Sequence, residues 1–394
     1  MEDKKFVLGL SRNVFFTGLV SLFMDISSEM VYPLIPLFLT GVLGATKTTV
    51  GIIEGIAEAT ASILKVFSGW LSDKLGKRKL LMTAGYGISA ASRPLIAASG
   101  TWFEVLTARF IDRFGKGVRT APRDAIIADS TQKEKLGLAY GFHRSMDTVG
   151  AVIGPVLAFM ILFLSTNNLR LVFYASTIPA VIAVALILIF ITEKKRAKGE
   201  AVPPKLSISS FNGPFRRYLV VIAIFSLGNF ADAFLVLQAE NLGVTRELIP
   251  VVYVAFNIVY ALSSAPMGAL ADKIGLKNMI LASFLLYSLI YLGVGFAASP
   301  VHIWILFPLY GIYKGMSEGT QKAYLAAIAP MEQKATAFGI YHTVSGVMLL
   351  PASIIAGYLW DNAGPGSTFL YGSAMSAAAA ALFAFTGKSD RHIR

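Results

Sequence analysis

The 394-residue chain contains no cysteine, which excludes disulfide bonds and thiolate metal sites and leaves the redox compartment undefined. Charged residues are also scarce, because Asp, Glu, Lys and Arg make up only 15% of the chain. A soluble globular protein is about a quarter charged. Hydrophobic residues reach 55% of the sequence. This composition predicts an integral membrane protein.

Sequence motifs of common enzyme classes are missing as well. The chain has no His-Glu-x-x-His zinc motif, no phosphate-binding P-loop and no Gly-x-Ser-x-Gly nucleophile elbow. Its 12 methionines are scattered, as expected for core packing and not for a copper-binding ladder. We therefore predict no cofactor and no metal site. A membrane-embedded enzyme is disfavoured because no nucleophile and base stand together.

The positive charge is unevenly placed along the chain. A net charge of +12 could indicate a nucleic-acid partner. However, most Lys and Arg outside the apolar segments lie in the tails, the 74–79 turn, the 194–217 segment and the turn at 273–277. The alternate loops hold only Lys47, Arg170 and Arg246. This positive-inside pattern predicts cytoplasmic termini, a plasma or inner cell membrane, and no nucleic-acid partner.

Twelve mostly apolar segments are long enough to span a bilayer, which takes about 20 residues. They are 12–40, 46–73, 77–98, 101–127, 136–166, 169–192, 215–241, 246–272, 276–298, 301–328, 334–362 and 367–387. The one long polar connection, 193–214, contains Pro203 and Pro204. We predict an all-α membrane protein with twelve transmembrane helices. They form two pseudo-symmetric six-helix bundles, 1–192 and 215–394, joined by the cytoplasmic linker 193–214.

The most distinctive motif is GWLSDKLGKRK, which runs from Gly69 to Lys79. A weaker copy, GALADKIGLK, begins 199 residues later (268 minus 69) at Gly268. A glycine-framed aspartate followed by basic residues suits a short cytoplasmic turn between membrane helices, although an ordinary basic turn is the alternative. The motif resembles the signature loop between helices 2 and 3 of the major facilitator superfamily. Its repetition resembles the two homologous halves of that superfamily.

This loop predicts a cytoplasmic gate. Asp73, with the basic residues that follow it, would latch onto the inner end of the fourth helix, where Asp124 or Asp129 is the acceptor. The resemblance implies that the latch also contacts the eleventh helix and holds an outward-open state. The predicted gate residues are Gly69, Asp73, Gly76, Lys77, Arg78, Asp124 and Asp129.

The fifth segment carries a pattern of small residues at Gly141, Gly150 and Gly154, followed by Pro155. Small residues let membrane helices approach closely, and the proline bends the helix. The pattern resembles the glycine-proline signature on helix 5 of the antiporter branches of the superfamily, with Ala158 and Phe159 where that signature has two more glycines. Antiport is therefore implied, and generic helix packing is the alternative.

Ionisable residues inside the spans are unusually frequent. At the bilayer centre each costs roughly 2.5–3.5 kcal/mol, so they are expected to pair and to face a cavity. The fourth segment is the densest, and six of its charged residues fall within about a third of the helix circumference. Within it, Arg113 to Gly117 resembles the helix-4 arginine signature of the superfamily, with Lys116 in place of the usual Gln. Its charged residues include Arg109, Asp112, Arg113, Lys116, Arg119, Arg123 and Asp124.

We predict one central cavity for solute and protons. Its carboxylates could exchange protons near neutrality, and the facing cations indicate an anionic or zwitterionic solute. Lys116 and Lys314, and likewise His143 and His342, occupy equivalent positions of the two halves. A structural ion pair or a core histidine is the alternative for each residue taken alone. The predicted cavity residues are Asp25, Glu29, Glu54, Glu58, Arg93, Arg113, Lys116, His143, Asp232, Lys314, Glu318, Lys322 and His342.

The charged spans and the resemblance together predict a secondary active transporter, working as a monomer in the lipid bilayer by alternating access. The expected activity is proton-coupled efflux of a small solute. Proton-coupled uptake by symport is one alternative, because both activities can share a fold. A non-transporting membrane sensor is another, which we disfavour because the tail from Lys388 to Arg394 is short.

Overall fold

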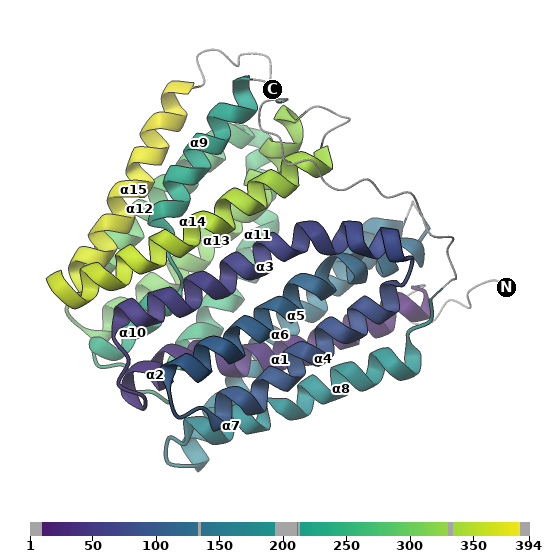
Figure 1. The fold of residues 1–394 in the computed structure, drawn as a ribbon. Coiled ribbons are helices and arrows are strands. Elements are labelled where there is room, and N and C mark those ends of the chain that lie inside the picture. The colour runs from purple at the N-terminus through teal and green to yellow at the C-terminus, as the bar shows by residue number, and fades with distance from the viewer. Residues whose placement is uncertain (1–9, 133–134, 194–210, 212, 330–333, 387–394) are drawn as a thin grey trace. The chain divides into compact units, whose positions relative to one another are not determined.

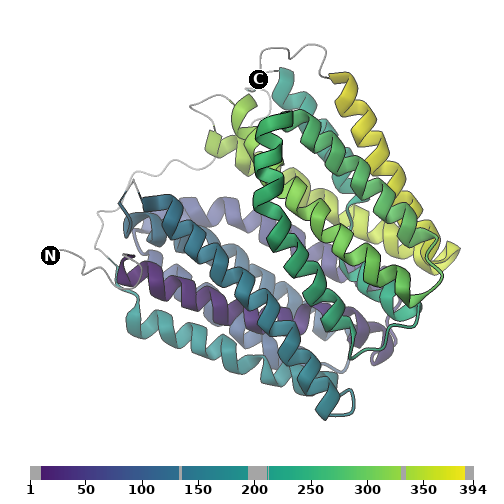
Figure 2. The same cartoon turned by 180° about the vertical axis from the view of Figure 1, so that it is seen from behind.

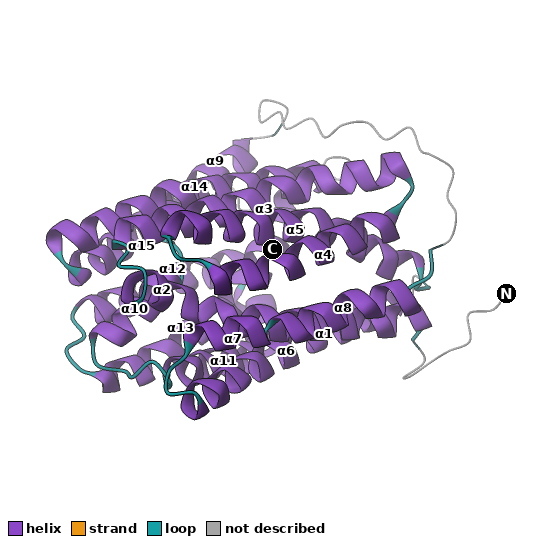
Figure 3. Ribbon diagram, turned by 60° about the horizontal axis from the view of Figure 1, so that its bottom comes forward, coloured by secondary structure: helices purple, strands orange, loops and turns teal. Residues whose placement is uncertain are grey.

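The computed structural model describes residues 10–132, 135–193, 211, 213–329 and 334–386, with the backbone alone for Asp73, Lys334, Ala335 and Thr386. All regular structure in these residues is helical, and Figure 3 shows no strand among them. Each of the twelve predicted segments corresponds to one helix or to two helices separated by a short break. The all-α prediction is therefore confirmed for the described chain.

Contacts divide the chain into two compact units. The first comprises Met1–Leu39 and Thr60–Pro204, and the second comprises Thr40–Ala59 and Lys205–Arg394. Helix α3 (Lys47–Leu75) contributes to both, because its beginning groups with the second unit. The predicted bundle limits at 192 and 215 stay a prediction, since most of the linker lies outside the described residues.

The helices of the first unit follow the predicted spans, with two breaks (Figure 1). The first break lies at Tyr32–Leu34, a short 3-10 turn (η1) that contains Pro33, whose nitrogen cannot donate a helical hydrogen bond. The second lies at Ser176. Besides the end of α3, the helices that begin in this unit are α1 (Arg12–Val31), α2 (Ile35–Gly41), α4 (Arg78–Ala98), α5 (Trp102–Asp129), α6 (Leu136–Leu164), α7 (Leu169–Ala175) and α8 (Thr177–Phe190).

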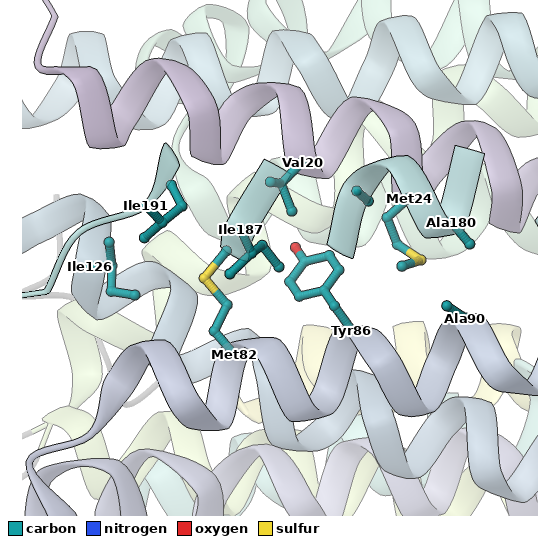
Figure 4. Packing of buried hydrophobic residues seen from close by; sticks show 10 residues of the cluster. Val20, Met24, Met82, Tyr86, Ala90, Ile126, Ala180, Ile187 and Ile191 are labelled. Carbon is teal, nitrogen blue, oxygen red and sulfur yellow. The ribbon is translucent and has the colours of Figure 1, made fainter. Parts of the chain in front are cut away.

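An apolar core joins α1, α4 and α8 of the first unit. Val20 of α1, Tyr86 of α4 and Ile187 of α8 are almost completely buried there. Figure 4 shows these side chains filling the space between the α1 and α4 ribbons. This packing fixes α1 relative to α4, the two helices that contribute Ser27, Ser28 and Arg93 to the site described below.

The second unit contains one informative interruption. Its first span is broken between α9 (Gly213–Gly228) and α10 (Ala233–Asn241). Tyr287 donates a hydrogen bond to the freed Gly228 carbonyl (2.8 Å), and the Ala231 amide donates to Ser353 Oγ (3.1 Å). The break therefore keeps its backbone groups bonded, as membrane proteins require. The remaining helices are α11 (Ile249–Ile274), α12 (Leu276–Gly295), α13 (Pro300–Ile328), α14 (Lys334–Ala363) and α15 (Pro365–Thr386).

Close packing through small residues holds the second unit together. Gly311 and Gly315 of α13 face the backbone of α11, and the two helices run along one another (Figure 2). The beginning of α3 packs on α14 through Gly357, and the Asp361 carboxylate accepts hydrogen bonds from the Lys47 and Thr48 amides. A carboxylate at a helix N-terminus satisfies its free amides.

Eight helical stretches of the described residues are long and apolar enough to cross a membrane by length and composition. The predicted spans outside this set are α3, α4, α5 and α13. These helices carry most of the ionisable residues predicted for the spans, which lowers their hydropathy. The helices with the weakest hydropathy signal therefore contain most of the candidate site.

Candidate functional site

Both copies of the loop motif place a glycine with positive φ at the end of a helix. Gly76 ends α3 with φ +61° and its amide donates to the Ser72 carbonyl, while Gly275 ends α11 with φ +90° and its amide donates to the Ala271 carbonyl. The two glycines are 199 residues apart, the offset of the motif itself. A side chain is disfavoured at such φ values, so glycine is needed at both helix ends.

The first copy of the loop is anchored by Arg78. Its guanidinium forms an ion pair with Asp129 and donates to the Ala125 carbonyl at 3.2 Å. Asp124, the other predicted acceptor, instead binds the neighbouring Arg123 at 2.8 Å. The Asp124 carboxylate is thus paired within its own helix, and its role as an acceptor for the loop stays a prediction. The Asp73 side chain lies outside the described residues, and Lys77 is exposed.

Glu193 lies at the same end of the first unit. It was not among the predicted site residues. Its carboxylate accepts hydrogen bonds from the backbone amides of Arg78 and Lys79, the start of α4. Asn13 of α1 binds Ser130 (3.0 Å) and the Thr192 carbonyl (2.8 Å) nearby. The ends of α1, α4, α5 and α8 are thus tied together where the linker begins. An acidic residue directly after an apolar span was the available sequence signal.

A cluster of arginines around Asp112 forms the most charged part of the first unit. Arg93 of α4 approaches Asp112 of α5 at 3.2 Å, Arg109 approaches it at 3.5 Å, and Arg113 at 4.0 Å. Arg93 and Arg109 are each 1% exposed, and Asp112 is 4% exposed. Three guanidinium groups therefore share one buried carboxylate. We call these four residues the arginine cluster.

The arginine cluster is continued by α1. Arg93 donates to Ser27 Oγ (3.1 Å) and Ser28 Oγ (2.9 Å). The guanidinium carbons of Arg109 and Arg113 lie 5.6 and 5.7 Å from the centroid of the Tyr32 ring. Hydroxyl and aromatic groups thus surround the cations, and the cluster joins α1, α4 and α5.

The helix-5 pattern packs α6 against α1. A Cβ at Gly150 would lie 2.7 Å from the Leu22 carbonyl oxygen, and one at Gly154 would lie 2.7 Å from the Ile26 carbonyl oxygen. Gly141 differs, because no atom lies within 4 Å of its Cβ position. The structure therefore gives a packing reason for two of the three predicted glycines and none for Gly141. Pro155 is buried within α6.

A matched pair of substitutions tests this packing. Gly150→Ala should lower the midpoint of thermal unfolding in detergent, because overpacking costs about 1–3 kcal/mol. Gly141→Ala should leave the midpoint unchanged or raise it, because alanine is the better helix former and the space is open. Equal shifts for the two variants would contradict the assigned α1–α6 contact.

Buried polar groups continue between α1, α5 and α6. His143 Nδ1 lies 3.5 Å from Asp147 Oδ2 on the next turn of α6. Among the described side chains, His143 Nε2, Asp147 Oδ1 and Arg119 Nη1 are buried without a hydrogen-bond partner. The sequence pointed to His143 but not to Asp147, although the spacing of four residues was a usable signal.

The predicted residues of the second unit centre on Asp232, which directly precedes α10. Tyr310 donates to Asp232 Oδ1 at 2.6 Å, and Lys314 Nζ lies 3.7 Å from Oδ2. Lys314 Nζ also lies 5.2 Å from the centroid of the Tyr310 ring. The side chains of Asp232 and Lys314 are 20% and 21% exposed, so this ion pair is not sealed.

The remaining predicted residues of this unit are more dispersed. Glu54 is 1% exposed in the part of α3 that belongs to this unit, and Glu58 follows one turn later. Glu318 is exposed and accepts a hydrogen bond from Tyr260 (2.6 Å). Lys322 is exposed, and the His342 ring lies edge-on to Tyr341 at 5.3 Å.

These features define a multi-pass helical membrane protein with ionisable groups buried inside its spans. The family model described as Major Facilitator Superfamily matches residues 17–237 and 218–393, essentially the whole chain. The chain therefore belongs to the major facilitator superfamily, and the resemblance drawn from its loop motif is confirmed. It is accordingly a transporter, expected in a lipid environment with a small-molecule substrate.

Similar proteins agree with this assignment. An uncharacterized MFS-type transporter of Methanocaldococcus jannaschii is 36% identical over 383 residues, 95% of each chain. The multi-drug resistance efflux pump PmrA homolog of Lactococcus lactis is 26% identical over 382 residues, 91% of this chain and 92% of the pump. The nucleoside transporter NupG shares the fold with a TM-score of 0.80 at 13% identity, covering 95% of this chain and 99% of NupG.

Proposed function

We propose that this transporter moves a small anionic or zwitterionic solute out of the cell in exchange for protons, by alternating access. It would act as a monomer in the cell membrane with both termini in the cytoplasm, as the positive-inside pattern of its loops supports. The observation that carries the proposal is the arginine cluster in the first unit.

The charge of that cluster supports an anionic group on the solute. The strongest charges acting on Arg93 are Asp112 and three other arginines. A buried charge is costly unless it is paired and hydrogen-bonded. Guanidinium groups also bind carboxylate and phosphate groups with two parallel hydrogen bonds. The guanidinium groups of the cluster therefore make it a candidate site for an anionic group of the solute.

Three further features support proton-coupled efflux. Carboxylates inside the spans, such as Asp25, can take up and release protons in a transport cycle. Relatives that are 25–26% identical carry the names multidrug resistance protein MdtG and multi-drug resistance efflux pump PmrA. The glycine-proline pattern on α6 also resembles the signature of antiporter branches, with Ala158 and Phe159 in place of two of its glycines.

Transport by vesicles under an imposed pH gradient tests the proposal. A thermal-shift screen of purified protein against metabolites and drugs first identifies a solute, because a bound ligand raises the unfolding temperature. In proteoliposomes with an acidic lumen, an antiporter should accumulate that solute, and a protonophore should abolish the accumulation. Vesicles without protein measure passive distribution.

The direction of accumulation separates the alternatives. A proton symporter would concentrate the solute in a basic lumen, because solute and proton then move together. Accumulation of the solute that does not depend on the pH gradient would contradict proton coupling. A solute that binds but is never moved would contradict transport of that compound.

A further inference from the structure

The contacts between α1 and α6 fix their relative register. Gly18 of α1 faces Phe142 and Met146 of α6. Further along, Gly150 faces Leu22 and Asp25. Gly154 in turn faces Ile26 and Glu29. The residue numbers of the two helices rise together, so α1 and α6 run parallel through the first unit.

This register places four titratable residues in a row. His143 and Asp147 are one turn apart on α6, and Asp25 and Glu29 are one turn apart on α1. Gly150, which is level with Asp25, follows Asp147 by three residues. With a rise of about 1.5 Å per residue, successive groups are about 4.5–6 Å apart along the helix axes. The order along the interface is His143, Asp147, Asp25, Glu29.

The groups of this row interact electrostatically with one another. The strongest charges acting on Asp25 are Asp147 and Glu29, opposed by Lys116 and Arg119 of α5. Around His143 the strongest are Arg123 and Asp124 of α5 and Asp147 and Arg144 of α6. Helix α8, which also packs on α1, has no titratable side chain. The cations that act on the row therefore come from α5 and, beside His143, from Arg144 of α6.

The buried atoms without partners lie within this row or beside it. His143 is 5% exposed, and its Nε2 has no hydrogen-bond partner among the described residues. Asp147 Oδ1 is likewise buried without one, and so is Nη1 of Arg119. Buried polar atoms are normally hydrogen-bonded. The unpartnered nitrogen of His143 and oxygen of Asp147 are therefore available to bind a proton.

We propose that His143, Asp147, Asp25 and Glu29 form a proton relay along the α1–α6 interface, in which Asp25 and Asp147 share one proton. The inference rests on the proposed proton coupling and assigns the residues that carry it. Between the two carboxyl groups, one O–H bond breaks and one forms on the partner carboxylate, so the Asp25–Asp147 pair keeps a charge of −1. Between His143 and Asp147, an imidazolium N–H bond breaks and a carboxyl O–H bond forms, or the reverse. Arg119 and Lys116 of α5 stabilise the negative charge of the pair.

Proton sharing follows from the geometry of the pair. Like charges in a desolvated site repel each other, and one proton held between two carboxylates relieves that repulsion. The pair then titrates as a unit and not as two independent groups. The relay therefore assigns a role in proton coupling to Asp147 as well as to its partner His143.

Infrared spectroscopy of the whole protein in lipid nanodiscs tests the shared proton, with the proton as the only ligand. The wild-type protein should show a protonated-carboxyl band that titrates with pH. Asp25→Asn and Asp147→Asn should each remove this band or shift its midpoint by about one pH unit or more, because coupled groups titrate together. Asp147→Glu should retain the titrating band, because it keeps a carboxyl group at this position.

Asp361→Asn is the matched control. It removes a carboxylate whose oxygens already accept hydrogen bonds from Lys47 and Thr48, so the titrating band should not change. An unchanged band in both Asp25→Asn and Asp147→Asn would overturn the relay. A change in only one of them would overturn the sharing. This readout needs no solute, so it is independent of the vesicle assay that tests the proposed function.

Discussion

Replacing Asp112 with asparagine should destabilise the protein more than any other single neutralisation in the first unit. The carboxylate is shared by Arg93, Arg109 and Arg113, and its side chain is only 6% exposed. Removing one partner of a buried ion pair typically costs about 3–5 kcal/mol, because the remaining charge stays buried without compensation. The midpoint of thermal unfolding in detergent and the folded yield measure the effect.

A neighbouring aspartate provides the matched control. Asp124 lies on the same helix and binds one arginine, but its side chain is 42% exposed. Exposed ion pairs contribute about 0–1 kcal/mol, so Asp124→Asn should change the unfolding midpoint little. If the Asp112→Asn variant were as stable as the Asp124→Asn variant, ion pairing would not hold the arginine cluster together.

The double variant Asp112→Asn/Arg93→Gln separates charge balance from packing. Removing one arginine together with the aspartate should recover part of the lost stability, and the coupling energy from the double-mutant cycle should be clearly different from zero. Arg93→Gln alone also removes the hydrogen bonds to Ser27 and Ser28. Strictly additive effects would contradict a direct interaction between Arg93 and Asp112.

Most of the helical architecture could be predicted because hydrophobic length sets a membrane span. The turn glycines were also predictable, since Gly76 and Gly275 repeat at the offset of the motif. The stripe on α5 followed from helical periodicity alone. Periodicity did not identify Asp112 as the carboxylate that the arginines share. That role depends on the contact with Arg93 of α4, which tertiary packing creates.

Residue roles that depend on orientation could not be derived from spacing. Glycine spacing did not reveal that Gly150 faces α1 and that Gly141 faces no neighbour. The choice between Asp124 and Asp129 as the acceptor of Arg78 depended on how the ends of α4 and α5 meet. Asp147 follows His143 by one turn of α6, but this spacing alone does not show that Asp25 lies across the helix interface.

The ion pair between Asp232 and Lys314 should be required for transport but not for folding. Lys314 Nζ lies 3.7 Å from the carboxylate and both side chains are about one-fifth exposed, so the pair is held loosely. Such pairs contribute about 0–1 kcal/mol to stability. A contact of this kind can open when the solute or a proton competes for one partner, which is how a small free energy shifts a two-state equilibrium.

We therefore expect Lys314→Gln and Asp232→Asn each to abolish solute accumulation in vesicles with an acidic lumen while the unfolding midpoint stays close to wild type. Tyr310→Phe removes the 2.6 Å hydrogen bond to Asp232 but keeps the ring, so it should reduce transport less. Arg216→Gln neutralises an exposed arginine on α9 that is not among the predicted site residues, and it should transport normally. Wild-type transport by Lys314→Gln, or a loss explained entirely by reduced folded yield, would assign the pair a structural role.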